Sequence, residues 1–271
     1  MNRIGAAFAR AQSEGRAALV TFVTAGDPDL QQSREILGAL ARAGADVVEL
    51  GLPFSDPSAD GPTIQASSAR ALKAGTTYDR VLELVRALRA GAIRGASPDL
   101  PVVLFGYFNP LFRRGNALPR ELTEAGVDGV LCVDLPPEEA PEVQGALRDV
   151  GIEIIRLVAP TTPAERVRRI GEGAGGFVYY VSMTGVTGAE LQDPSSLAPR
   201  VEAVRRETGL PVAVGFGVDT PEKVRALAAF ADGVVVGSAI VRRIAEGAED
   251  RVQAVERFVR ALRNATRRRS V

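Results

Sequence analysis

Eight short apolar runs, rich in β-branched residues, recur along this chain, and amphipathic stretches separate them. The runs are Leu19–Thr24, Asp46–Leu50, Val102–Gly106, Gly129–Val133, Glu153–Val158, Phe177–Ser182, Val212–Gly215 and Gly233–Gly237. Strands that alternate with helices in this way predict parallel βαβ units, and therefore an α/β fold. A chain of 271 residues has the usual length of one (β/α)8, or TIM, barrel. We therefore predict a single barrel domain over residues 1–271.

Several of the stretches between the runs open with proline at the first helical position, a common start signal. Helices are predicted over Gln31–Ala43, Pro137–Val150, Pro163–Ile170, Pro221–Phe230 and Ser238–Glu246. The gap between the second and third runs is long enough for two helices, predicted at Thr63–Lys73 and Tyr78–Ala92. An extra N-terminal helix, Arg3–Glu14, would cover the bottom of the barrel, and Asp250–Ala265 would close the chain.

The composition excludes several classes of function. The chain has no histidine, which removes Ser-His-Asp and Cys-His catalysis and histidine-ligated metals, and leaves carboxylates and tyrosines as proton carriers. We therefore expect metal-free acid/base chemistry. Basic and acidic residues balance at 33 each, so no overall field favours nucleic acid or an anionic membrane.

The chain carries no sign of export. No apolar stretch approaches the ~20 residues that span a bilayer, and Met1–Gly15 lacks the apolar segment of a signal peptide. We therefore expect a cytoplasmic protein. The single cysteine, Cys132, cannot form an internal disulfide and is expected to be a buried strand thiol.

Two carboxylates stand where an α/β barrel places its chemistry, at the C-terminal end of the second run. Glu49 lies inside the apolar run, where an unpaired charge is costly, and Asp60 lies in the Pro- and Gly-rich loop that follows. If the strands face inward, Glu49 would be ringed by Phe22, Leu104, Tyr107, Leu131 and Val133. Such a pocket raises a carboxyl pKa and suits proton transfer on an aromatic substrate. The alternative is an ordinary connection with solvated acids.

Other residues would complete this site. Asp60 could accept a hydrogen bond from a substrate N–H, with Thr187 orienting it, and Tyr179 would bring a hydroxyl near the reacting centre. The alternative for Tyr179 is a core tyrosine. The long segment Met183–Pro194 holds two glycines and suits a lid, the alternative being a flexible surface loop.

A phosphate site is predicted at the ends of the seventh and eighth runs, the recurring anion site of these barrels. Gly217 follows the seventh run, and Gly237 and Ser238 follow the eighth and open a helix. Glycines let backbone N–H groups approach phosphate oxygens, and the helix dipole adds positive potential. Gly188 could supply one more N–H group.

Seven segments, in order along nearly the whole chain, resemble the tryptophan synthase alpha subunit family. They are Phe22–Pro28, Glu49–Gln65, Tyr107–Pro110, Gly129–Pro136, Tyr179–Gly188, Gly215–Gly217 and Gly237–Val241. The resemblance implies reversible retro-aldol cleavage of indole-3-glycerol phosphate to indole and glyceraldehyde 3-phosphate, without a cofactor in this chain. It makes Glu49 the acid/base and Asp60 the partner of the indole N–H. It also places the phosphate contacts on Gly188, Gly217, Gly237 and Ser238.

The same resemblance implies a partner, a beta subunit that carries pyridoxal phosphate, usually in an α2β2 complex that passes indole through a tunnel. The expected interface comprises Pro53–Asp60, with Asp56, and the segment from Asp134 to Pro136. The chain departs from the family at two positions that concern the lid and the signalling between subunits: Met183 replaces a frequent arginine, and Ala66 replaces an amide. Two alternatives remain, another phosphate-binding barrel enzyme and a catalytically silent activator of a beta subunit.

Overall fold

The computed structural model describes residues 2–139, 141–181, 194–215, 217–247 and 250–268. Within these residues, nine parallel strands form one sheet in the order β5-β4-β3-β2-β1-β9-β8-β7-β6. The strands are β1 Ala18–Thr24, β2 Val47–Gly51, β3 Val102–Gly106, β4 Gly129–Cys132, β5 Glu153–Ile154, β6 Arg156–Val158, β7 Val178–Val181, β8 Val212–Gly215 and β9 Gly233–Val236. Only Ile155 separates the two outermost strands, β5 and β6, so the sheet curls into a barrel. The predicted (β/α)8 barrel is confirmed, with its fifth strand divided in two.

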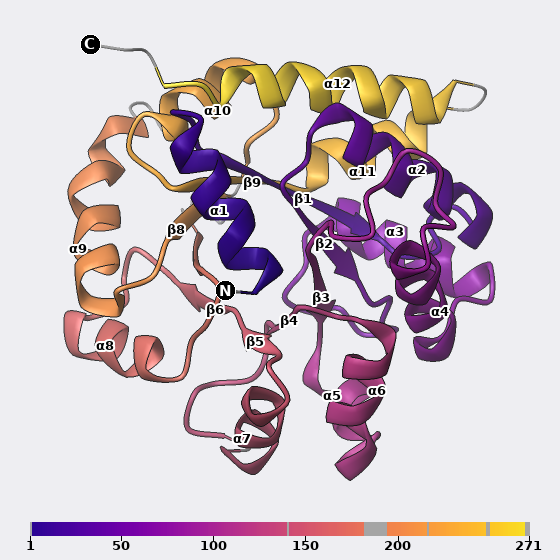
Figure 1. Cartoon of the computed structure of the whole chain (residues 1–271), viewed down its shortest axis with the longest axis horizontal. Coiled ribbons are helices and arrows are strands. Elements are labelled where there is room, and N and C mark those ends of the chain that lie inside the picture. Colours follow the sequence, from indigo (N-terminus) through magenta and orange to yellow (C-terminus); the bar gives the residue numbers. More distant parts are fainter. Residues whose placement is uncertain (1, 140, 182–193, 216, 248–249, 269–271) are drawn as a thin grey trace.

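Helices surround the barrel (Figure 1). They are α1 Arg3–Ser13, α2 Leu30–Ala43, α3 Pro62–Lys73, α4 Tyr78–Arg89, α5 Phe108–Phe112, α6 Leu118–Ala125, α7 Pro141–Asp149, α8 Ala164–Glu172, α9 Ala198–Thr208, α10 Pro221–Ala228, α11 Ser238–Glu246 and α12 Arg251–Ala265. The extra helix α1 and the two helices between β2 and β3 are confirmed. The predicted start of a helix at Pro137 is wrong, because α7 begins only at Pro141. None of the described helices is both long and apolar enough to cross a membrane.

Side chains along each strand alternate between the lumen of the barrel and the layer under the helices, as the two-residue period of a strand requires. Leu104 belongs to the outer layer, so the prediction that it would ring Glu49 is wrong. Its neighbour Val103, the register partner of Glu49, takes the inner position. The sequence pattern does not determine which residues of β3 face the lumen and which face the helices.

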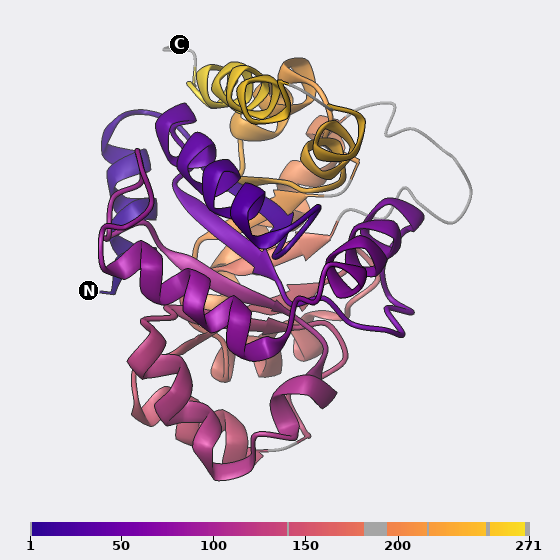
Figure 2. The same ribbon diagram turned by 90° about the vertical axis from the view of Figure 1, so that its right-hand side faces the viewer.

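Helix α1 lies across one end of the barrel (Figure 1) and places apolar side chains in its lumen. Phe8 stacks on Phe177 with 5.3 Å between the ring centroids, and Ile4 is fully buried in the same cluster. Figure 2 shows the strands pointing away from α1 and the N-terminus. The strand ends that can hold chemistry therefore lie at the opposite end of the barrel.

Three buried or half-buried aspartates anchor the strands at the end covered by α1. Each accepts an N–H from the first or second residue of a neighbouring strand and pairs with an arginine. The sets are Asp46 with Leu19 and Arg16, Asp128 with Val102 and Arg89, and Asp232 with Val212 and Arg205. The prediction that Asp46 begins a strand is therefore wrong by one residue, because its side chain serves as this anchor and β2 begins at Val47.

Candidate active site at the barrel mouth

Glu49 lies in the lumen near the C-terminal end of β2, between its register partners Phe22 and Val103. Its side chain is buried, with the residue only 1% exposed, and Oε1 has no hydrogen-bond partner among the described residues. Burial raises the pKa of this carboxyl from 4.5 to about 8. The protonated form therefore dominates at neutral pH, and Glu49 can give up or recover a proton close to pH 7.

Tyr179 on β7 shares the lumen with Glu49 and is partly buried. Burial, and then the negative charge of Glu49, raise the pKa of the Tyr179 hydroxyl, so it remains a proton donor. Gly215 on β8 makes room for this ring, since a Cβ atom there would lie 2.8 Å from the hydroxyl oxygen. The structure thus brings a tyrosine hydroxyl and a buried carboxyl into one space.

Aromatic rings form part of the wall of this space. Phe22 meets Phe105 edge to face, with 5.0 Å between centroids. Gly51 allows the Phe22 ring to lie over the end of β2, because a Cβ there would come within 2.7 Å of the ring. Leu131, the register partner of Phe105, is fully buried among the inner side chains. The wall suits a flat apolar ligand, and on β3 it is Phe105, with Val103, that faces the lumen and not Leu104.

Asp60 lies in the connection between β2 and α3, residues 52–61, and its side chain is partly buried. Burial raises the pKa of its carboxyl above the ordinary 3.8, and a hydrogen bond with Tyr107 opposes this increase. The Tyr107 hydroxyl also accepts the Ala59 N–H at 2.9 Å. The Tyr107 ring stacks on Phe54 at 5.1 Å. The sequence predicts Tyr107 in the pocket, but these contacts join segments far apart in the chain and have no local sequence signal.

The predicted phosphate loops lie at the ends of β8 and β9. Gly237 is the N-cap of α11 and has no side-chain cap, so the first N–H groups of that helix are available to an anion. A Cβ on Gly237 would lie 3.2 Å from the Cβ of Phe22, which places this helix end beside the aromatic wall. Gly217 has a φ of +65°, a conformation that favours glycine, and it and Ser238 are exposed. Thr187, Gly188 and nearly all of the predicted lid lie outside the described residues.

The residues predicted to face a partner lie near the same end of the barrel. Asp56 is exposed, and the Ser55 hydroxyl donates to its carboxylate at 2.5 Å. Asp134 is also exposed and accepts the Phe108 N–H at 2.7 Å, which ties the end of β4 to α5. Pro136, two residues further on, is partly buried.

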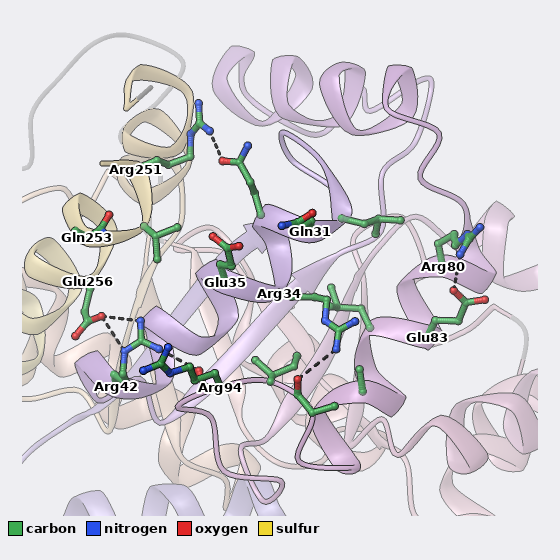
Figure 3. A pocket seen from close by; sticks show the side chains of 17 residues that line it. Gln31, Arg34, Glu35, Arg42, Arg80, Glu83, Arg94, Arg251, Gln253 and Glu256 are labelled. Carbon is green, nitrogen blue, oxygen red and sulfur yellow. Dashed lines mark hydrogen bonds and ion pairs between the residues drawn. The ribbon is translucent and has the colours of Figure 1, made fainter. Parts of the chain in front are cut away.

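A hollow lies elsewhere, on the outside of the barrel between α2, α4 and α12 (Figure 3), with a volume of about 1200 Å³. Many of its charged groups are engaged with one another. Arg42 pairs with Glu256 at 2.8 Å and Arg80 with Glu83 at 3.0 Å, while Arg34 donates to the Ala92 carbonyl. Size alone does not make this hollow the candidate site, because the unpaired carboxyl of Glu49 lies in the barrel.

Comparison with known proteins agrees with this geometry. The family model described as tryptophan synthase alpha chain matches residues 8–268. The protein of that name from Geobacter sulfurreducens is 49% identical over 267 residues, which cover 98% of this chain and 99% of the relative. The one from Geobacter sp. (strain M21) is 52% identical over 243 residues, 89% of each chain.

Solved structures give the same result. Tryptophan synthase subunit alpha from Legionella pneumophila str. Paris has a TM-score of 0.89 and 38% identity, covering 98% of both chains. A chain of tryptophan synthase from M. tuberculosis, in an aminoacrylate-bound form, has a TM-score of 0.86 and 32% identity over 98% of this chain and 100% of that one. The similarity therefore extends through the whole barrel.

Proposed function

Because this chain belongs to the tryptophan synthase alpha chain family, a family of lyases, we propose that it cleaves indole-3-glycerol phosphate to indole and glyceraldehyde 3-phosphate. The observation that carries this proposal is the buried Glu49 carboxyl, which has an unpartnered oxygen and a pKa of about 8 beside an aromatic wall. Cleavage at a ring carbon requires protonation of that carbon, and therefore a proton donor that works near neutral pH.

In the proposed reaction, Glu49 donates its proton to C3 of the indole ring while the Asp60 carboxylate accepts a hydrogen bond from the indole N–H. The bond between C3 and the glycerol chain then breaks, and its electron pair returns to the ring. The Glu49 carboxylate that the first step leaves then takes the proton of the adjacent glycerol hydroxyl, so that this carbon becomes the aldehyde and Glu49 is protonated again. Negative charge at Asp60 stabilises the positive charge that develops on the ring nitrogen. Tyr179 holds its hydroxyl close to Glu49 during these steps.

Purified protein should therefore release indole from indole-3-glycerol phosphate, which is measured directly by absorbance or chromatography. Another phosphate-binding barrel enzyme would bind the phosphate but release no indole. A silent activator would release none alone or with a beta subunit, although it would accelerate that subunit's own reaction. The buried carboxyl argues against silence, because an unpaired acid is costly to retain in a core.

The phosphate end of the substrate is proposed to bind at Gly217, Gly237 and Ser238, and at Gly188. The Gly237→Val variant should bind glycerol phosphate about tenfold more weakly or worse, because its methyl groups would crowd both Phe22 and the N–H groups of α11. Calorimetry measures this affinity. Gly145→Val on α7, where a Cβ meets open space, is the matched control. Unchanged affinity in Gly237→Val would place the phosphate elsewhere.

We also propose that a beta subunit, in an α2β2 complex, covers the barrel mouth, receives the indole and carries the pyridoxal phosphate. The exposed Asp56, in the loop that carries Asp60, and the segment from Asp134 to Pro136 are proposed as the contact surface. The barrel chemistry described above uses side chains of this chain alone.

The Asp56→Ala variant should retain the stability of the wild type, because the Asp56 side chain is exposed and its hydrogen bond is to the neighbouring, equally exposed Ser55. It should nevertheless lower the rate increase that a beta subunit confers, since that increase depends on ordering the loop that carries Asp60. Indole release at saturating beta subunit tests this. Equal activation of both proteins would show that Asp56 does not transmit the signal.

A further inference from the structure

The hydroxyl of Tyr107 connects two parts of the barrel mouth that are far apart in sequence. Tyr107 follows β3 directly and is 5% exposed, so its ring is fixed in the wall. The Ala59 N–H donates to the hydroxyl oxygen at 2.9 Å, and the hydroxyl also hydrogen-bonds the Asp60 carboxyl. Phe54, at the start of the same loop, stacks on the ring. One side chain thus contacts this loop at both ends.

The direction of these hydrogen bonds follows from the groups involved. A backbone N–H can only donate, so the hydroxyl oxygen accepts from Ala59. A hydroxyl has one proton, and that proton remains free to be donated to the Asp60 carboxylate. Burial and the negative charge of Asp60 raise the pKa of Tyr107 to about 12, so the proton stays on the hydroxyl at neutral pH.

The rest of the loop has local hydrogen bonds that do not fix the carboxyl. The Asp60 N–H donates to the Pro57 carbonyl at 3.0 Å, and Gln65 Nε2 donates to the Asp60 carbonyl at 2.8 Å. These bonds hold the backbone of residue 60 but leave its side chain free to rotate. Among the described residues, Tyr107 is the one side chain whose hydrogen bond to the Asp60 carboxyl shifts its pKa.

We propose that Tyr107 is a positioning residue for the reaction, whose hydroxyl orients the Asp60 carboxylate toward the ring nitrogen while anchoring the loop through Ala59. This role rests on the proposed function for its catalytic consequence, but the contact with Ala59 can be tested without any substrate. It differs from the expectation that Tyr107 merely lines the substrate pocket.

The Tyr107→Phe variant keeps the ring and its stacking on Phe54 but removes the hydroxyl. We expect kcat for indole release to fall on the order of ten- to a hundredfold, as for a lost hydrogen bond to a charged group. Asp60 would also ionise less readily, so the acid side of the kcat/KM profile should move to higher pH. Tyr78→Phe, which removes a hydroxyl beside Glu121 from a ring that Arg114 covers at the start of α4, is the matched control and should change neither quantity.

Amide hydrogen exchange is the second measurement, and it needs no activity. The Ala59 N–H should exchange faster in Tyr107→Phe than in the wild type and in Tyr78→Phe, because its acceptor is gone. Unchanged exchange would overturn the anchoring role. An increase in KM alone, with the acid side of the profile unmoved, would assign Tyr107 to direct substrate contact and overturn the positioning role. Wild-type protein that releases no indole would refute the proposed function, while the exchange result would still decide the contact.

Discussion

The Glu49→Gln variant should lose nearly all indole release while keeping the fold, because an amide cannot donate a proton to C3 or take one back. General acid/base groups typically supply about 10² to 10⁴ in rate. The comparison requires kcat for both proteins at saturating indole-3-glycerol phosphate. Glu83→Gln, an exposed glutamate on α4 that pairs with Arg80, is the matched control and should be fully active. Turnover near the wild-type value in a folded Glu49→Gln protein would refute the assignment.

The raised pKa of Glu49 also makes two predictions about pH. If the free enzyme must hold this proton, wild-type kcat/KM should fall as pH rises through about 8.

The stability of the protein should depend on the same group. In the unfolded chain Glu49 loses its proton near 4.5, whereas the folded protein keeps it to about 8, so its contribution to the free energy of unfolding declines as pH rises between these values. The free energy of unfolding of the Glu49→Gln variant, measured by urea titration, should decline less over this pH range than that of the wild type.

The Asp60→Asn variant should also be strongly impaired, by on the order of 10² to 10³ in kcat, because the amide carries no charge to stabilise the ring nitrogen. The amide oxygen can still accept from the Tyr107 hydroxyl, so the loop should keep its position. The variant therefore tests charge separately from placement. The acid side of the pH profile, where wild-type activity falls as Asp60 gains a proton, should disappear.

The control for this variant is Asp99→Asn, since the Asp99 side chain is 87% exposed and lies away from the barrel mouth. The Asp60→Asn and Asp99→Asn variants should have similar melting temperatures. If Asp60→Asn weakened substrate affinity but left kcat unchanged, the carboxylate would contribute to binding of the ground state and not to the transition state.

The sequence predicted the barrel because its signals are local and repeated. Each β-branched run needs only its own residues to be recognised, and the order of runs and helices then implies parallel pairing. The division of the fifth strand could not be predicted in this way. Glu153 and Ile154 pair with β4, whereas Arg156–Val158 pairs with β7, so the break at Ile155 is imposed by closure of the barrel. Closure is a property of the whole sheet.

The candidate site was predictable to the extent that it depends on position along a strand. Glu49 stood out as a carboxyl inside an apolar run, and the glycines after β8 and β9 stood out from their order. Which residues of β3 point into the lumen could not be predicted, because Val103, Leu104 and Phe105 are all apolar and either alternation fits the pattern. The link from Tyr107 to Ala59 could not be read either, since it joins two loops through one hydroxyl.

The placement of α1 has a consequence for traffic through the barrel. Phe8 and Ile4 of α1 fill one end of the lumen, together with inward side chains such as Phe177. In the described part of the chain, the lumen is therefore closed at the end that α1 covers and opens only at the other end. In the proposed reaction, the substrate would enter and both products would leave past the same rim. A subunit seated on that rim would control entry and exit together, and the order in which the two products depart would become a property of the complex.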